Sequence, residues 1–186
     1  MTWDFPVSVA ADGKKYQIRN RCDYRVVLDV LEALNDEELP PEYRIECALR
    51  IFYKDFTDAC DMETLIREML IIINYGEEEN EAEREKESPR LMDWSHDFKQ
   101  IAPPVSRILG YDVRTPRKYT HWYTFLAGYF EIGECTFSTV VSIRNKRMKG
   151  KKLEKWEEEF LRDNRKLVEL PHALSAEEEA FLLEDW

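Results

Sequence analysis

The strongest constraint on the fold is the spacing of apolar residues between Asp23 and Asn74. Over this stretch apolar side chains recur every three or four positions, which is the period of an amphipathic helix. The pattern predicts three successive helices: one from Asp23 that ends within 35–38, one that begins at Pro40-Pro41, and one over 62–74 with Asp61 as N-cap. Glycine and proline are scarce, at 6 and 8 of 186 residues, which argues against a loop-rich sandwich.

The segment 5–19 has a different period. Apolar and polar residues alternate on both sides of Asp12-Gly13, and this dipeptide is a strong signal for a tight turn. We therefore expect a small N-terminal β-hairpin. Two strands alone are marginally stable in water, so the hairpin must lean on helices or on a partner's sheet edge.

Beyond Gly76 the sequence alternates between polar connections and further helical patterns. An acidic linker is predicted at 77–88, where seven glutamates precede residue 88 with almost no apolar content. Next, the sequence predicts a short helix from about 91 that ends at Pro103-Pro104, and a short turn up to Gly110. An aromatic helix is predicted over 119–132, followed by a helix rather than a strand over 137–143 with Thr136 as cap. The last of these elements is a charged helix over 154–167, with Trp156, Phe160, Leu161 and Leu167 facing inward.

A final short helix is predicted over 175–186, because Ser175 and Glu178 have the spacing of a capping box. The fold class expected for the chain is therefore mainly α: a compact multi-helix domain with a small N-terminal β-hairpin, and a single domain over residues 1–186. No internal repeat is visible.

Charge and composition exclude several classes of partner. The net charge of −11 argues against a nucleic-acid duplex, because phosphate contacts need a basic surface. No stretch approaches 18 consecutive apolar residues and the N-terminus lacks the features of a signal peptide, so neither a membrane span nor secretion is expected. The four cysteines, Cys22, Cys47, Cys60 and Cys135, form no CxxC pair and are expected to be buried free thiols, as suits a reducing cytoplasm.

Little in the sequence points to catalysis. Asp93, His96 and Asp97 form the one cluster of ligand-like residues, but they match no metal motif, and exposed Asp and His are common on amphipathic helices. His121 is more simply explained as a packed histidine than as a general base. No phosphate-binding loop or nucleophile motif is present, so we expect no enzyme activity, no catalytic residues, no metal and no cofactor.

The run 144–152 contains six basic residues and is the one segment that could contact nucleic acid. It lacks interleaved aromatic residues and lies next to glutamate-rich sequence. A solvated loop or pairing with carboxylates of the same chain is therefore favoured over nucleic-acid binding.

Three longer segments resemble a known family. They are 94–114, the segment His121-Trp122-Tyr123-Thr124-Phe125 with the residues up to Gly128, and Phe137 to Lys146 with its Ser142-Ile143-Arg144-Asn145-Lys146 end. Together, and in this order, they resemble the bacteriophage "gene product fifteen" family of phages that infect Gram-positive bacteria. The resemblance extends from about Pro6 to Leu170, and its most specific parts are HWYTF and SIRNK.

The resemblance implies a gene located before that of the tape-measure protein, and hence a tail-assembly chaperone in the host bacterial cytoplasm. Its partners would be the phage tape-measure protein and the major tail protein, with self-association left open. The alternatives are a structural tail component retained in the virion and a small nucleic-acid-binding regulator. The partner-contact candidates are Trp122, Phe125, Tyr129 and Phe130 on the aromatic helix, and Phe181, Leu182 and Trp186 in the tail. Core packing is favoured for the first group, whereas for the tail docking on its own chain and partner binding stay equally open.

Overall fold

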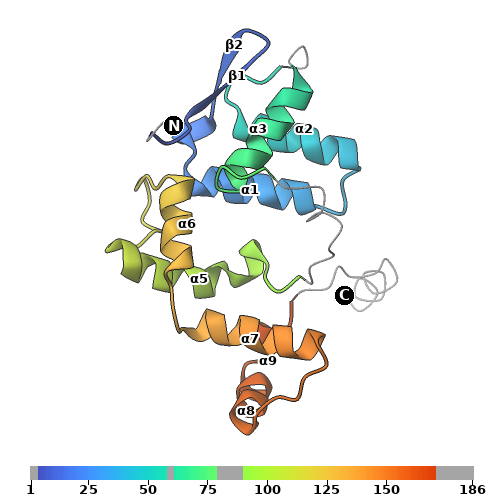
Figure 1. Cartoon of the computed structure of the whole chain (residues 1–186), viewed down its shortest axis with the longest axis vertical. Helices are drawn as coiled ribbons and strands as arrows, with labels where there is room; N and C mark the ends of the chain where they lie inside the picture. The colour runs from blue at the N-terminus through green and yellow to red at the C-terminus, as the bar shows by residue number, and fades with distance from the viewer. Residues whose placement is uncertain (1–3, 58–60, 79–89, 171–186) are drawn as a thin grey trace, which may run out of the picture.

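The computed structural model describes residues 4–57, 61–78 and 90–170, and the described chain is mainly helical, as predicted (Figure 1). The helices are α1 (Tyr24–Asn35), α2 (Pro41–Phe52), α3 (Met62–Ile73), α5 (Trp94–Leu109), α6 (Trp122–Phe130), α7 (Thr136–Met148), α8 (Lys155–Asp163) and α9 (Arg165–Val168), with one 3-10 turn, η1 (Arg19–Arg21). The predicted tail helix over 175–186 and most of the acidic linker lie outside the described residues.

The N-terminal hairpin is confirmed. Strand β1 (Ser8–Ala11) pairs antiparallel with β2 (Lys14–Gln17), and the two turn residues, Asp12 and Gly13, both have positive φ. This is the geometry of a type I′ turn, in which Gly13 adopts its conformation without steric conflict. The hairpin rests on the helices of its own chain: Ile18 forms a β-bridge with Tyr53 just beyond α2, and β1 lies against α3 (Figure 1).

The first three helices begin and end close to the predicted positions. The carboxylate of Asp23 accepts a hydrogen bond from the N–H of Arg25, and that of Asp61 from the N–H of Thr64, so each satisfies an N–H group that the first helical turn leaves free. At the C-terminal end of α2, two backbone carbonyls gain a hydrogen-bond donor from the segment that follows the hairpin. The Arg19 guanidinium donates to the carbonyls of Arg50 and Ile51. A cation at a helix C-terminus also interacts favourably with the helix dipole.

Helix α5 differs from the prediction. It continues without interruption through Pro103 and Pro104, where the sequence predicted an end, and it stops only at Gly110 in the left-handed conformation. The two prolines lack the N–H groups that would bond the carbonyls of Lys99 and Gln100. Buried apolar residues on both sides of the prolines hold the helix together: Ile101, Ala102, Pro104 and Val105 are all buried. The stabilisation from tertiary packing here outweighs the tendency of proline to end the helix.

The C-terminal half contains one confirmation and three corrections. The segment 137–143 is helical, as predicted, but Cys135 rather than Thr136 is the N-cap of α7. The predicted helix over 154–167 is two helices, α8 and α9, which meet at Asn164. Trp156 does not face inward: it is 52% exposed, and its indole N–H donates to a carboxylate oxygen of Glu154.

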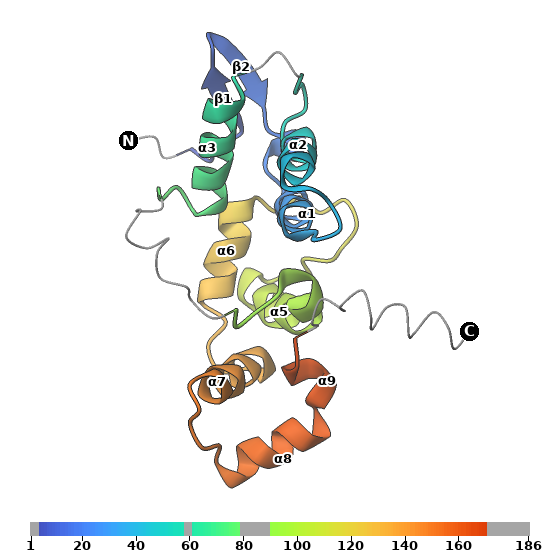
Figure 2. The ribbon, with the colours of Figure 1, turned by 90° about the vertical axis from the view of Figure 1, so that its right-hand side faces the viewer.

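The buried apolar residues form two separate groups. The first, the main core, extends from the hairpin through α1, α2, α3, α5 and α6 to Phe137 of α7. The second, the C-terminal cluster, consists of Val140, Ile143 and Val168, with partly buried Leu153, Phe160, Leu161 and Leu167 around them. Figure 2 shows the corresponding layers: the hairpin with α2 and α3 at one end, α1, α5 and α6 between, and α7 to α9 at the other end.

The structure also bears on the cysteines and on the length and apolarity of the helices. The described cysteines are free, as predicted, but only Cys22 is fully buried, while Cys47 and Cys135 are half-buried; Cys60 lies outside the described residues. Burial, followed by the charge of Asp23, raises the pKa of the Cys22 thiol to about 12, so it is protonated at neutral pH. None of the helices in the described ranges combines the length and apolarity that crossing a membrane requires.

Candidate functional site

An aromatic hollow lies where the end of α3 meets α6 and the start of α5. Its volume is about 510 Å³, and most of its lining is apolar. The residues that line it are Leu31, Ile73, Asn74, Tyr75, Glu77, Glu78, Trp94, Trp122, Leu126, Tyr129 and Phe130. Two of its rings project into solvent, since Tyr75 is 44% and Phe130 is 64% exposed. Large exposed apolar side chains gathered at one place indicate a binding surface.

The backbone at the end of α3 places Tyr75 in this hollow. Tyr75 has φ 62° and Gly76 has φ 90°, so two consecutive residues leave the helix in the left-handed region. The N–H of Gly76 returns to the carbonyl of Ile71 at 2.8 Å and closes the helix end. The Tyr75 ring is thereby held 4.7 Å from that of Tyr123 and 6.0 Å from that of Phe130. A tyrosine at positive φ carries backbone strain, and such strain gathers at functional sites.

Trp94 connects this hollow to a second one. Its ring lies 5.1 Å from that of Tyr129 and 5.7 Å from that of Trp122, so Trp94 packs against α6 and lines the hollow. Trp94 and Leu31 line both hollows, so the two hollows adjoin at these residues, and we call them together the groove. We call the 510 Å³ part the aromatic half of the groove.

The second part, the acidic half, has a volume of about 860 Å³ and lies between the C-terminal half of α1 and the start of α5. Five carboxylates line it: Asp29, Glu32, Asp36, Glu38 and Asp93. Within the described ranges, Arg90 is the one cation among its lining residues, and it forms an ion pair with Asp93. Partial desolvation, and then the charge of Glu32, raise the pKa of Asp29.

The sequence-predicted contact residues separate into three groups. Trp122 and Phe125 are buried, and the indole N–H of Trp122 donates to the carbonyl of Ile73, so these two residues belong to the core. Tyr129 is half-buried at the edge of the aromatic half, and Phe130 is exposed. Phe181, Leu182 and Trp186 lie outside the described residues.

Three further groove residues, Leu31, Tyr75 and Trp94, had no place among the predicted contacts. Each follows the apolar pattern of its own helix or helix end. The sequence signal available for Tyr75 was its position directly before Gly76, at the end of an apolar helix.

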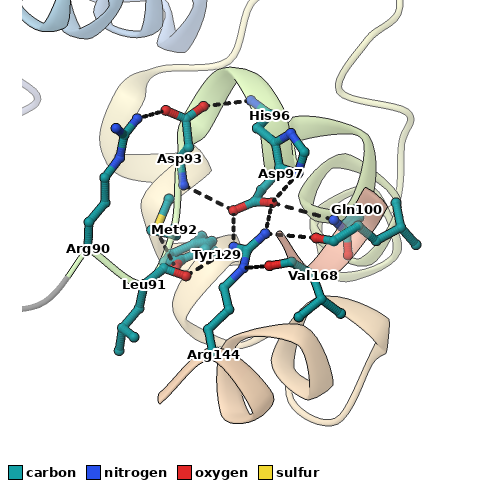
Figure 3. A network of polar contacts seen from close by, with 11 residues as sticks. Arg90, Leu91, Met92, Asp93, His96, Asp97, Gln100, Tyr129, Arg144 and Val168 are labelled. Atoms are coloured by element: carbon teal, nitrogen blue, oxygen red, sulfur yellow. Dashed lines mark hydrogen bonds and ion pairs between the residues drawn. The ribbon is translucent and has the colours of Figure 1, made fainter. Parts of the chain in front are cut away.

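A buried ion pair lies on the side of α5 that faces α7 (Figure 3). Asp97 is 0% exposed, and its two carboxylate oxygens accept hydrogen bonds from Arg144 at 2.6 and 2.9 Å. The remaining N–H groups of Arg144 donate to the carbonyls of Leu91, Leu167 and Val168. All five N–H groups of the guanidinium are thus used, as a buried charge requires.

This ion pair explains the residues that looked like a metal cluster. Asp93 is the N-cap of α5 and accepts the N–H of His96, while its own N–H donates to Asp97. Asp97 is not one of the exposed aspartates that amphipathic helices commonly carry, which corrects the sequence-based interpretation. Within the described ranges, no three His, Cys, Asp or Glu side chains come together as metal ligands would.

His121 is packed, as the sequence analysis favoured. Its ring is 2% exposed and stacks on that of Phe5, with centroids 4.2 Å apart. Its Nδ1 accepts the N–H of Tyr123 as the N-cap of α6, which leaves the proton on Nε2, 3.2 Å from the carbonyl of Pro6. Burial is the main cause that lowers the pKa of His121, so the imidazole is neutral at neutral pH.

Two members of the basic run pair with carboxylates of the same chain, one of the two explanations favoured above. Arg144 binds Asp97, and Lys146 lies 2.7 Å from the buried carboxylate of Glu157. Glu157 also accepts the N–H of Glu154 at the start of α8. That backbone hydrogen bond and Lys146 lower the pKa of Glu157.

The profile of a family described as Bacteriophage Gp15 protein matches residues 2–170. The chain belongs to this family. Searches of curated proteins and of solved structures returned no match. The family resemblance noted in the sequence is thereby confirmed, and the chain is a phage protein.

The segments that carry the Gp15 resemblance have structural explanations in this fold. In HWYTF, His121 caps α6 and Trp122 bonds the end of α3, while Phe125 stacks on Tyr24 at 4.4 Å. In SIRNK, Arg144 and Lys146 provide the two ion pairs that join α7 to α5 and α8. The most specific parts of the sequence therefore stabilise the fold around the groove, and one of their residues, Trp122, also lines its aromatic half.

Proposed function

We propose that this Gp15-family protein is a tail-assembly chaperone that binds the phage tape-measure protein in the host cytoplasm. The observation that carries the proposal is the groove: an exposed aromatic hollow that adjoins an acidic one. Family membership supplies the phage context, and the groove supplies a surface for another protein.

The physical task of such a chaperone matches these properties. A tape-measure protein is expected to be long, helical and apolar along one stripe, so that it would aggregate if the stripe stayed in water. Covering the stripe requires exposed apolar side chains, of which Tyr75 and Phe130 are the ones at the groove. A net charge of −11 on the chaperone would keep the complex soluble through mutual repulsion of its copies.

The proposal requires binding and no chemistry. The chain would cover its partner while tail-tube subunits assemble and would then leave, so it would be absent from the finished virion. Mass spectrometry of purified virions distinguishes this role from that of a structural tail component, which would be found in them. The pairing of Arg144 and Lys146 with carboxylates reduces the positive surface available to a nucleic acid.

Co-expression with the tape-measure protein tests the proposal. We expect the tape-measure protein to be soluble and to co-purify with the wild-type chain, and to precipitate without it. Phe130→Asp should abolish co-purification, because a carboxylate would enter the aromatic half of the groove.

The matched control is Tyr43→Asp on α2. Tyr43 is 54% exposed, close to the 64% of Phe130, and does not line the groove, so this variant should co-purify like the wild type. A tape-measure protein that is equally soluble with and without the chain contradicts the proposal.

A further inference from the structure

We propose that the groove binds an amphipathic helix whose apolar stripe is bordered by lysine and arginine, with the stripe on the aromatic half and the basic residues on the acidic half. The inference rests on the proposed function, since the tape-measure protein is the chain expected to carry such a helix. It adds the chemical class of the segment that is recognised.

The charges around the groove favour a basic occupant. Seven of its lining residues are carboxylates: the five of the acidic half, and Glu77 and Glu78 at the aromatic half. Among the residues that the structure describes, Arg90 is the one cation that lines it, and Asp93 already pairs with that residue. Asp29, Glu32 and Glu38 are exposed, and no Lys or Arg of the described residues forms an ion pair with them.

The arrangement of these groups fits the two sides of an amphipathic helix. Asp29 and Glu32 are three residues apart on α1 and therefore lie on one face of that helix. Leu31 and Trp94 line both halves, so a helix that spans the two halves meets rings in one and carboxylates in the other. Helix-in-groove binding of this kind takes its affinity from apolar anchors and its selectivity from the bordering charges.

The chain's own segments match this chemistry less well. The tail over 174–186 has the apolar residues Phe181, Leu182 and Trp186, but it also carries five acidic residues and no lysine or arginine. The segment 79–89 offers Ala82 and Pro89 as its apolar residues. Like charges disfavour both as occupants of an acidic groove, so the groove is assigned to a partner.

Binding of two designed peptides to the full chain tests the inference. The peptides share one leucine and phenylalanine stripe on a helix; the first borders it with Lys and Arg, the second with Glu. Titration calorimetry should show the basic peptide binding roughly tenfold or more tightly than the acidic one, with the difference shrinking as salt rises. Equal affinities of the two peptides would overturn the inference.

Two charge variants locate the effect. Asp29→Lys with Glu32→Lys should weaken the basic peptide roughly tenfold and strengthen the acidic one, because attraction becomes repulsion. The matched control is Glu158→Lys with Glu159→Lys, an equal change of charge on exposed positions of α8 away from the groove. An equal loss in both double variants would mean that net charge alone attracts the peptide, which contradicts a charge-matched groove.

Two further arms separate the rival outcomes. Replacing Phe181, Leu182 and Trp186 by serine in the full chain should leave affinity for the basic peptide unchanged. A large gain would show that the tail occupies the groove and would overturn the assignment to a partner.

Co-purification of the tape-measure protein with the Asp29→Lys, Glu32→Lys variant distinguishes the two proposals. Unchanged co-purification refutes the inference and leaves the chaperone role, whereas no co-purification even with the wild type refutes the chaperone role.

Discussion

In the main core, rings stack on rings: Tyr24 lies 4.4 Å from Phe125, which lies 5.9 Å from Trp122, and all three are buried. The C-terminal cluster buries three aliphatic side chains, Val140, Ile143 and Val168, and is joined to the rest by hydrogen-bonded charges. The first region is stabilised by apolar area, which tolerates small shifts. The second depends on a few directed contacts, which fail when one partner is lost.

The difference explains where the groove lies. Its walls come from α1, α3, α5 and α6, the elements of the main core, so the exposed rings of Tyr75 and Phe130 are fixed by a rigid base. The C-terminal helices hold α5 from the opposite side through Asp97 and Arg144. The C-terminal cluster should therefore respond to substitution and pH more locally than the main core does.

Phe125→Ala should have one of the two largest effects on stability. The side chain is fully buried among rings, so its removal leaves a cavity and should lower the free energy of unfolding by about 3–5 kcal/mol. Urea unfolding followed by tryptophan fluorescence and by circular dichroism should show one shifted transition for the whole chain. The claim of a single cooperative main core fails if the two signals separate.

Arg144→Met should lower the stability of the C-terminal helices by about 3–5 kcal/mol, because it leaves the Asp97 carboxylate buried without a partner. Hydrogen exchange should show lost protection in α8 and α9, with α1 to α3 protected as before. Adding Asp97→Leu should restore part of the loss, since the carbonyls of Leu167 and Val168 still lack their donor. A double variant no more stable than Arg144→Met would show that the carbonyl contacts, and not the ion pair, hold this region.

Glu157→Gln should lower stability by about 1 kcal/mol near pH 7, since a charge-assisted contact with Lys146 is lost. The folded-state pKa of Glu157 is lowered, so its stabilisation is present above the ordinary value of 4.5 and disappears as pH falls below it. Unfolding free energies of wild type and variant should therefore converge at low pH, as the pH falls through the lowered folded-state pKa of Glu157. Glu158→Gln, at the exposed neighbouring position, is the control and should change little at either pH. A constant gap across this range would contradict the assignment.

Phe130→Asp should have the smallest effect on stability and the largest on binding. Phe130 is 64% exposed, so we expect a change within about 0.5 kcal/mol in the unfolding free energy. The same variant should lose the tape-measure protein in co-purification. A loss of several kcal/mol would show instead that Phe130 belongs to the core, and the groove would need another definition.

The sequence predicted most of the fold where the signals are local. Asp61 as a cap, Asp12-Gly13 as a turn and the periodicity of α1 to α3 each depend on neighbours within four residues. The passage of α5 through Pro103 and Pro104 was not predictable in this way, because it depends on burial against other elements. Spacing alone predicted that Trp156 faces inward. The ring is exposed, which shows that a polar helix can present an aromatic side chain to solvent.

The site was less predictable than the fold. Asp97 and Arg144 are 47 positions apart, so neither residue carries a local sign of the other. Among the aromatic candidates, helical spacing could not separate buried Trp122 and Phe125 from exposed Phe130, since all lie on one short helix with apolar residues on most sides. Tyr75 follows α3 and Trp94 begins α5, and the two residues line the groove because the tertiary fold packs both against α6.

Site-specific photocrosslinking in phage-infected cells tests the central claim most directly. A photoreactive phenylalanine analogue would replace Phe130 in one chain and Tyr43 in another, two exposed positions of which only the first lines the groove. The account predicts a crosslinked product with the tape-measure protein from position 130 and none from position 43. A product from neither position, or equal products from both, would contradict a tape-measure protein bound in this groove.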